Sequence, residues 1–248
     1  MTPYYKEDGI AIYCGNALDV LPDLEPFDAL VTDPPYSSGG AFRSDRMRTS
    51  VEKYVNSDTI VNRPEFSGDN RDQRAYYAWC ALWLSFALTG CKPGAHALIF
   101  SDWRQLPTTT DALQAGGWIW RGVGTWWKPG IRMQRGGFSQ SAEYVVWGTC
   151  GSWGRENDHS PQNVIRSAPV GDDKVHIAEK PEAVLEWLVP FAPKGGLVLD
   201  PFMGSGTTLV AAKRAGRRAI GIELLEENCA LAVVRLKQGM LQVGEAIA

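Results

Sequence analysis

The chain has 248 residues, of which 44% are hydrophobic and 21% charged, and its formal net charge is −3. This length allows one large domain with a substantial core, and the composition is that of an ordinary soluble globular protein. No hydrophobic run is long enough to cross a bilayer and the N-terminus lacks a secretory pattern, so we expect a cytoplasmic protein without a membrane partner.

The five cysteines are scattered along the chain, without CxxC spacing and without neighbouring histidines. This pattern argues against a zinc site and against a disulfide framework. The sequence therefore predicts no bound metal, and we expect the thiols to pack as small hydrophobic groups.

The predicted elements alternate between strands and helices from the N-terminus onward. This order indicates an α/β fold with a mostly parallel central sheet and helices on both faces. The predicted strands are 10–14, 27–32, 96–100, 118–127 (one or two strands), 142–147, 197–200 and 218–222. The predicted helices are 17–24, 75–89, 107–115, 181–191, 207–215 and a C-terminal helix, and a turn is predicted at 91–94.

Two polar stretches, about 37–74 and 148–174, interrupt this pattern without clear periodicity. Loops of this length inside a compact domain are usually functional. We therefore interpret residues 1–248 as one catalytic domain that carries two inserted segments.

One of the two informative motifs is a glycine turn, LDPFMGSGTT, which joins a predicted strand to a predicted helix. Gly204 and Gly206 allow a ligand to approach the backbone, and the following helix N-terminus presents N–H groups to an anion. The third glycine of a dinucleotide turn and the GK[ST] ending of a Walker loop are both missing. Glu223 ends the next strand, where an acid can accept the hydroxyls of a ribose. A small-anion site beside a ribose site favours S-adenosylmethionine (AdoMet).

The other motif is LVTDPPY, in which a predicted strand ends at Asp33, Pro34, Pro35 and Tyr36. The amino group of adenine or cytosine is a poor nucleophile because its lone pair is delocalised into the ring. Two acceptors on its hydrogens, the Asp33 carboxylate and the Pro34 carbonyl, would direct that lone pair out of the ring plane. The prolines fix the backbone, and Tyr36 offers a face on which an extruded base can stack. We interpret the motif as a clamp around a flat aminated base.

With these two motifs, the chain resembles the AdoMet-dependent DNA amino-methyltransferases of the β class. The resemblance extends from about residue 10 to residue 236. In that class the Asp-Pro-Pro-Tyr motif precedes the Phe-x-Gly-x-Gly motif, as TDPPY precedes DPFMGSGTT here. The resemblance implies a Rossmann-like methyltransferase fold with a circularly permuted motif order. It also implies catalytic roles for the four clamp residues and a cofactor site formed by Asn16, Asp33, Lys180, Asp200, Phe202, Gly204, Ser205, Gly206, Thr207, Thr208 and Glu223.

Lys180 belongs to the segment HIAEKP, which resembles the His-Pro-x-x-Lys-Pro element of the family. By this resemblance, Lys180 and the N–H groups of residues 204–208 hold the methionine carboxylate. Ile177 and Ala178 replace the usual Pro-Thr pair, and Asn16 stands where the family often has Asp near the cofactor adenine.

DNA contacts are expected in a window that contains no acid, between Asp111 and Glu143. Lys128, Arg132 and Arg135 lie in this window and can contact phosphates or guanine edges. Trp127 and Lys128, followed by Glu143 and Gly148, resemble the family segment that flanks the base pocket. Since the recognition segments are short and related enzymes are often dimers, we expect a homodimer on double-stranded DNA.

The target is expected to be adenine N6, because family members with Asp at the first clamp position mostly modify adenine. Cytosine N4 is the alternative, whereas cytosine C5 chemistry needs a cysteine after proline, which the chain lacks. A DNA-binding relative without catalysis and an enzyme acting on RNA or protein amides also stay open. No segment resembles an endonuclease, and the expected place of use is a prokaryotic or phage genome, at the nucleoid.

Overall fold

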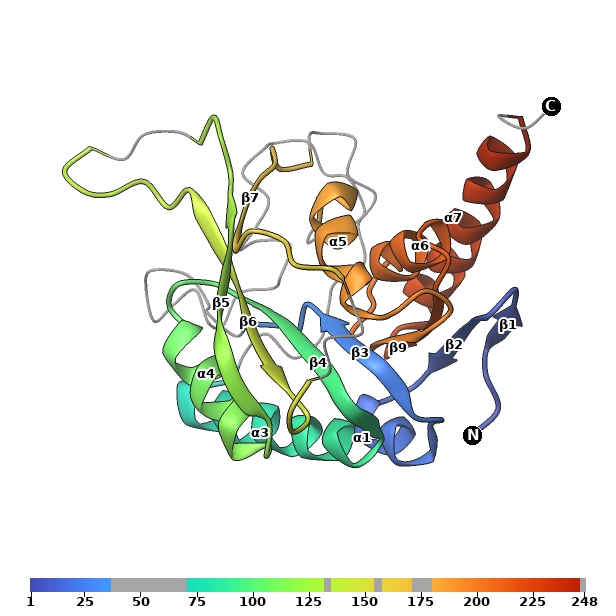
Figure 1. Ribbon diagram of the computed structural model, residues 1–248, viewed down its shortest axis with the longest axis horizontal. Coiled ribbons are helices and arrows are strands. Elements are labelled where there is room, and N and C mark those ends of the chain that lie inside the picture. Colours follow the sequence, from blue (N-terminus) through green and yellow to red (C-terminus); the bar gives the residue numbers. More distant parts are fainter. Residues whose placement is uncertain (37–70, 132–134, 154–157, 171–179, 246–248) are drawn as a thin grey trace.

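The computed structural model describes the backbone of residues 1–36, 71–131, 135–153, 158–170 and 180–245. In this part of the chain nine strands form one sheet, in the order β1-β2-β9-β8-β3-β4-β6-β5-β7 (Figure 1). The strands are β1 (Tyr5–Glu7), β2 (Ile10–Cys14), β3 (Phe27–Thr32), β4 (Cys91–Ser101), β5 (Ile119–Trp127), β6 (Ala142–Thr149), β7 (Val164–Arg166), β8 (Leu197–Asp200) and β9 (Arg218–Glu223).

Helices cover both faces of the sheet. They are α1 (Ala17–Val20), α3 (Gln73–Thr89), α4 (Leu106–Ala115), α5 (Glu182–Leu188), α6 (Thr207–Arg214) and α7 (Glu226–Glu245), with 3₁₀ turns η1 (Leu21–Asp23) and η3 (Val189–Phe191). Helices α1, α3 and α4 lie on one face, and α5, α6 and α7 lie on the other (Figure 1). The predicted α/β fold, mostly parallel with helices on both faces, is confirmed.

The central strands are parallel: β2 pairs with β9, β9 with β8, β8 with β3, and β3 with β4. Their carboxyl ends therefore meet at one edge of the sheet. The chain passes from β3 to β4 through α3 on one face, and from β8 to β9 through α6 on the other. The direction of winding thus changes between β8 and β3, and ligands of open α/β sheets bind at such a change.

The core consists of two apolar clusters, one on each face of the sheet. Alternate residues of β3 enter them in turn: Ala29 and Val31 face α5, α6 and α7, whereas Leu30 faces α1 and α3. Trp83 and Tyr76 of α3 are fully buried on the second face. This alternation follows from the period of two residues in a strand. Asp33, the first residue after β3, therefore follows a backbone that is packed on both faces.

Prolines shorten two of the predicted helices. The predicted helix 17–24 is α-helical only to Val20, and the predicted helix 181–191 runs from Glu182 to Leu188. The remaining turns are 3₁₀ and contain Pro22 and Pro190, whose missing N–H groups cannot continue an α-helix. Pro181, expected in the first turn, is instead the residue that precedes α5.

The turn predicted at 91–94 is wrong, because these residues belong to β4. Cys91 pairs with Phe27, and Gly94 N–H donates to Cys150 O, so neighbouring strands take up the hydrogen bonds of this Pro-Gly segment. The short strands β1 and β7 were not predicted, since three residues are too few to show a period. The cysteines are free, as expected.

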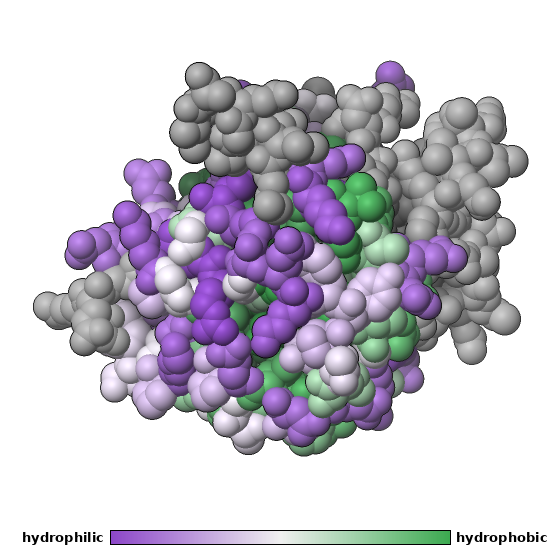
Figure 2. Space-filling model, turned by 90° about the vertical axis from the view of Figure 1, so that its right-hand side faces the viewer, coloured by the Kyte–Doolittle hydropathy of each residue, from purple (hydrophilic) through white to green (hydrophobic). Residues whose placement is uncertain are grey.

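Hydrophilic side chains predominate on the side of the molecule that carries β1 and α7, with smaller hydrophobic areas between them (Figure 2). No helix in the described ranges is both long and apolar enough to span a bilayer. The structure describes little of the predicted insert at 37–74, only residues 71–74, so most of that prediction lies outside the described residues.

Gly148 holds β6 close to β5 and α4, and its replacement should destabilise the fold. A Cβ at Gly148 would lie 2.7 Å from the Ile119 carbonyl oxygen and 2.9 Å from Leu113 Cδ2. We expect Gly148→Ala to cost about 1–3 kcal/mol of unfolding free energy and to lower Tm by roughly 3–10 °C. The control is Gly90→Ala, where the nearest atom to a Cβ is 3.8 Å away. Equal Tm values for the two variants, measured by thermal unfolding, would contradict this account.

Candidate active site

The two sequence motifs meet at the ends of the adjacent strands β3 and β8. Thr32, the last residue of β3, donates a buried 2.7 Å hydrogen bond from Oγ1 to Asp200 Oδ1, at the end of β8. Asp33 follows Thr32 directly, and the glycine turn follows Asp200. Residues that are far apart in the sequence are thus held at the point where the winding of the sheet changes.

Asp33 uses both of its carboxylate oxygens within the protein. Oδ1 accepts a 2.5 Å hydrogen bond from the Tyr36 hydroxyl, and Oδ2 accepts one from the Lys180 ammonium. The ammonium also lies 5.4 Å from the centre of the Tyr36 ring. The predicted clamp residues are therefore brought together, and Lys180 lies against them.

Glu143 of β6 extends this arrangement into a network of four charges. Its Oε2 lies 3.5 Å from the Lys180 ammonium, and its Oε1 accepts a hydrogen bond from Lys128, at the end of β5. Two carboxylates and two ammonium groups therefore balance one another in a poorly solvated region, where the side chains of Lys180 and Glu143 are only 10% and 18% exposed. Sequence reasoning placed Glu143 near the base pocket but gave it no role.

Burial and pairing set the protonation of this network. Burial raises the pKa of the Asp33 carboxyl above its ordinary value, although the Lys180 ammonium lowers it. For Glu143 burial also raises the pKa, but Lys180 and Lys128 outweigh it and the pKa is lowered. Burial lowers the pKa of Lys180, but the two carboxylates outweigh it and the pKa is raised. Glu143 and Lys180 are therefore held as ions.

The glycine turn brings the backbone close to Glu223 and to α7. Gly204 and Gly206 have φ angles of +51° and +81°, and Gly204 N–H donates a 3.1 Å hydrogen bond to Glu223 Oε2. A Cβ at Gly206 would lie 2.8 Å from Ala232 Cβ. Only glycine fits this position without strain, so the turn is held tightly at the N-terminus of α6.

Several side chains of the glycine turn form hydrogen bonds with, or pack against, other parts of the protein. Arg235 of α7 donates to Ser205 Oγ at 2.8 Å and to Thr207 Oγ1 at 3.0 Å. The Phe202 ring packs against Trp79 and Trp83 of α3, with ring centres 5.1 Å apart in each case. The backbone of the turn, more than these side chains, is therefore what it can offer to a ligand.

Asp200 and Thr208 are buried as well, with exposures of 3% and 6%. Asp200 Oδ1 also accepts a 3.1 Å hydrogen bond from Phe202 N–H. The Asp200 side chain thus links the strand ends and shapes the start of the turn.

Glu223 and Asn16 lie at the ends of β9 and β2. Glu223 Oε1 accepts hydrogen bonds from Leu225 N–H at 2.9 Å and from Asn228 Nδ2 at 3.3 Å. Burial raises its pKa, which these hydrogen bonds and that of Gly204 partly offset. Asn16 caps α1 by accepting from Leu18 N–H at 3.1 Å, and Gly15 N–H donates to Glu223 O. Both residues therefore stand at the same sheet edge as the clamp.

The predicted DNA contacts lie on the connection between β5 and β6, which projects away from the sheet in Figure 1. Lys128 is at its base, where its N–H donates to Ser141 O at 2.7 Å. Arg135 is exposed, Arg132 lies outside the described residues, and Phe138, which sequence reasoning missed, is 91% exposed. The Lys128 side chain joins the charge network through Glu143.

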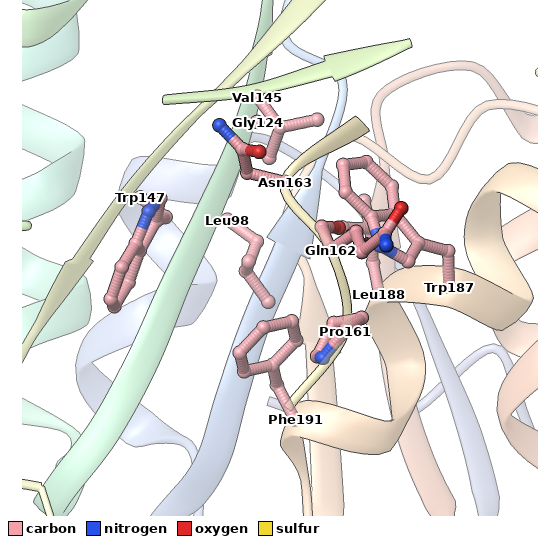
Figure 3. Close-up of a pocket in the computed structure, with 10 residues that line it drawn as sticks. All are labelled: Leu98, Gly124, Val145, Trp147, Pro161, Gln162, Asn163, Trp187, Leu188 and Phe191. Atoms are coloured by element: carbon pink, nitrogen blue, oxygen red, sulfur yellow. Dashed lines mark hydrogen bonds between the residues drawn. The ribbon is translucent and has the colours of Figure 1, made fainter. Parts of the chain in front are cut away.

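A cavity of about 100 Å³ lies between the sheet and α5 (Figure 3). Trp147 lies on one side of it, Trp187 and Phe191 on the other, with Leu98 between them (Figure 3). The residues that line it are Leu98, Gly124, Val145, Trp147, Pro161, Gln162, Asn163, Trp187, Leu188 and Phe191. This lining contains no residue of either motif, so the cavity is distinct from the clamp. The described residues contain no group of three or more His, Cys, Asp or Glu side chains that could hold a metal ion.

Comparison with known proteins relates the chain to DNA methylases. A family model described as "DNA methylase" (N6_N4_Mtase) matches residues 150–234. The Type II methyltransferase M2.DpnII of Streptococcus pneumoniae is 28% identical over 95% of this chain and 92% of its own length. M2.LlaDCHI of Lactococcus lactis subsp. cremoris is 27% identical over 96% and 93%. The chain is therefore similar to Type II methyltransferases along nearly all of its length, and residues 150–234 match the N6/N4 DNA methylase family model.

Solved methylase structures share its fold. The M1.HpyAVI–SAM complex has a TM-score of 0.65 at 24% identity, covering 92% of this chain and 98% of that one. The cytosine-N4-specific PvuII DNA methyltransferase has a TM-score of 0.71 at 16% identity, covering 94% and 88%. The chain therefore has the predicted methyltransferase fold, with the Asp-Pro-Pro-Tyr motif before the glycine turn.

The Asp200 carboxyl should make the stability of the methylase depend on pH. Burial raises its pKa from 3.8 to about 6, against the hydrogen bonds that lower it. The folded state is disfavoured once the carboxyl must ionise, so this contribution to stability is lost as the pH rises from 4 towards 6. Asp200→Asn removes the titration. Its unfolding free energy relative to the parent should therefore rise by about 2 kcal/mol between pH 4.5 and pH 7.

The measurement is chemical unfolding of parent and variant at a series of pH values. Asp111→Asn, at an exposed position of α4, is the control and should follow the parent. A pH-independent difference between Asp200→Asn and the parent would show that Asp200 does not titrate in this range.

Proposed function

We propose that the chain transfers the methyl group of AdoMet to the N6 amino group of an adenine that is extruded from double-stranded DNA. The observation that carries this proposal is the position of Asp33. Its carboxylate stands at the end of β3, beside Tyr36 and next to the glycine turn that Thr32 and Asp200 hold in place. The match to the DNA methylase family model and the similarity to Type II methyltransferases support the same reaction class.

The residues at the sheet edge fit AdoMet as the cofactor. Gly206 brings backbone close to a ligand because a Cβ there would meet Ala232, and the N-terminal amides of α6 suit a carboxylate. Glu223 lies one strand away, where the hydroxyls of a ribose would be placed. When bound, AdoMet supplies the electrophilic methyl group. The turn at 204–208, Glu223 and Asn16 would hold it with that group towards Asp33.

The clamp would prepare the amino group for attack. The Asp33 carboxylate and the Pro34 carbonyl each accept one amino hydrogen, which directs the nitrogen lone pair towards the methyl group. Pro34 and Pro35 hold the backbone, so these acceptors need no rearrangement. Stacking on Tyr36, typically worth about 1–3 kcal/mol, offsets part of the few kcal/mol needed to extrude the base.

The identity of the base is a separate step of the proposal. Asp in the first clamp position resembles the adenine-N6 members of the family more than the cytosine-N4 members. Cytosine N4 is the second candidate because the clamp chemistry is the same for both amino groups. Mass spectrometry of nucleosides from methylated DNA distinguishes N6-methyladenine from N4-methylcytosine.

DNA recognition would come from segments outside the sheet. We assign it to the β5–β6 connection with Lys128, Arg132 and Arg135, and to the segments 37–74 and 148–174. Because these segments are short, a second copy of the chain is expected to complete the contact, and a two-fold dimer would suit a palindromic site. Sedimentation with and without duplex DNA measures this stoichiometry.

Replacement of Asp33 should abolish turnover while AdoMet still binds. We expect Asp33→Ala to lower kcat for methyl transfer to duplex DNA by at least about two orders of magnitude, because the partner of the amino group is lost. Asp33→Asn keeps the shape of the side chain but not its charge, so it tests the charge alone. Its kcat should also be strongly lowered. The measurement is transfer of labelled methyl groups, with AdoMet binding by calorimetry. Retained turnover in either variant would refute the role of Asp33.

Arg135 should contribute to DNA binding through phosphate. Arg135→Ala is expected to weaken duplex binding and to reduce the slope of log K against log salt by about 1. Arg218→Ala is the control, since Arg218 pairs with Glu25 at the opposite end of β9. If the two variants show the same salt slope as the parent in fluorescence anisotropy, Arg135 lies away from the phosphates.

A further inference from the structure

The Lys180 ammonium lies where the proposed reaction needs a nucleobase amino group. It donates to Asp33 Oδ2, faces the Tyr36 ring at 5.4 Å and lies 5.2 Å from the Phe100 ring. An amino group held by the clamp would need the same Asp33 oxygen and the same space beside Tyr36. While Lys180 stays there, its charge also cancels that of the carboxylate. The ammonium must therefore leave Asp33 before the clamp can act.

Glu143 offers a second acceptor for this ammonium. Its Oε2 is buried and forms an ion pair with Lys180 Nζ at 3.5 Å, a separation that is long for a charge-assisted hydrogen bond. An approach of about 0.7 Å would bring the pair to the length of a charge-assisted hydrogen bond. A buried carboxylate oxygen without a closer partner calls for an explanation, and a second position of the Lys180 ammonium supplies one.

Lys128 determines the direction in which Glu143 Oε2 points. Its ammonium binds Glu143 Oε1, and its backbone N–H is fixed by Ser141 O across the base of the β5–β6 connection. In the sheet, Glu143 pairs with Trp126 of β5, so its Cα is fixed as well. The carboxylate is therefore held from one side, with Oε2 turned towards Lys180.

We propose that Glu143 is a positioning residue that takes over the Lys180 ammonium when a nucleobase enters the clamp. In the free chain Lys180 is shared, with its hydrogen bond on Asp33. In the loaded clamp it moves onto Glu143 Oε2, and Asp33 Oδ2 becomes free for the amino hydrogen. The network keeps its charge balance throughout, since two carboxylates and two ammonium groups stay in place. This inference rests on the proposed function.

The first test compares turnover with binding. In Glu143→Gln the second acceptor has no charge, so Lys180 stays on Asp33. We expect kcat for duplex methylation to fall tenfold or more, while the Kd for AdoMet and the KM for DNA change less than about threefold. Glu143→Asp, which restores the charge, should recover part of kcat. Glu182→Gln, which removes a carboxylate that pairs with Arg214 at the surface, is the matched control and should behave as the parent.

The second test needs no DNA. It uses an AdoMet analogue in which an ammonium group replaces the methylsulfonium group, and this ammonium would itself bind Asp33. The comparison ligand is S-adenosylhomocysteine, whose thioether is neutral at that position. By calorimetry, Glu143→Gln should weaken the analogue about tenfold and leave the neutral ligand unchanged. In a Lys180→Met background the same substitution should have little effect, because no ammonium has to move. A penalty that persists without Lys180 would show plain loss of a nearby negative charge and would overturn the inference.

The outcomes separate this inference from the proposed function. A parent protein that neither binds AdoMet nor methylates DNA would refute both. A parent that methylates DNA, with Glu143→Gln as active as the parent, would refute only the role of Glu143. A loss of kcat, cofactor affinity and Tm together in Glu143→Gln would show a merely structural role and would also refute it.

Discussion

The hydrogen bond from Thr32 to Asp200 joins the ends of β3 and β8, and the whole site depends on it. The clamp begins one residue after Thr32, and the glycine turn begins directly after Asp200. Because both strands are buried and parallel, their backbones fix where each motif starts, and the side-chain bond fixes one motif against the other. Methyl transfer requires the acceptor nitrogen and the methyl group at one place in one orientation. A buried bond between two strand ends provides that precision without a dedicated loop.

Burial raises the pKa of both acids at these strand ends, but the charged groups around them differ. Asp200 is held by neutral donors, so its ionised form is poorly stabilised and its pKa is raised to about 6. Asp33 has a cation beside it, but that cation is shared with Glu143. Removing one charge from such a network leaves another without compensation, which is why its members are expected to act as a unit. The same sharing lets the network respond to a ligand without a change in net charge.

The motifs could be interpreted from the sequence because they are local. The chemistry expected of each motif, Asp-Pro-Pro-Tyr or the Gly-x-Gly turn, depends on adjacent residues at the end of a strand. It does not depend on how the rest of the chain packs. The placement of Lys180 could not be predicted, because it depends on how α5 packs against the sheet. The role of Glu143 was missed for the same reason: its partners come from the end of β5 and from the segment before α5. Alternation along β6 shows that Glu143 shares a face with buried Val145, and this is the one signal that pointed inward. The short 3₁₀ turns follow from Pro22 and Pro190 and were within reach of the sequence.

The β5–β6 connection is linked to the charge network through Lys128 at its base. Lys128 closes the base of the connection through its backbone and binds Glu143 through its side chain. Arg135 and Phe138, which follow Lys128 in the β5–β6 connection, are exposed. In the proposed mechanism, a duplex that contacts this connection would act on Lys128 first and on Glu143 next. Glu143 would then determine how strongly the Lys180 ammonium is drawn from Asp33. Under the two proposals, contact with a duplex and release of the clamp would be connected through adjacent side chains, and Asp33 would stay paired with Lys180 until DNA is in place.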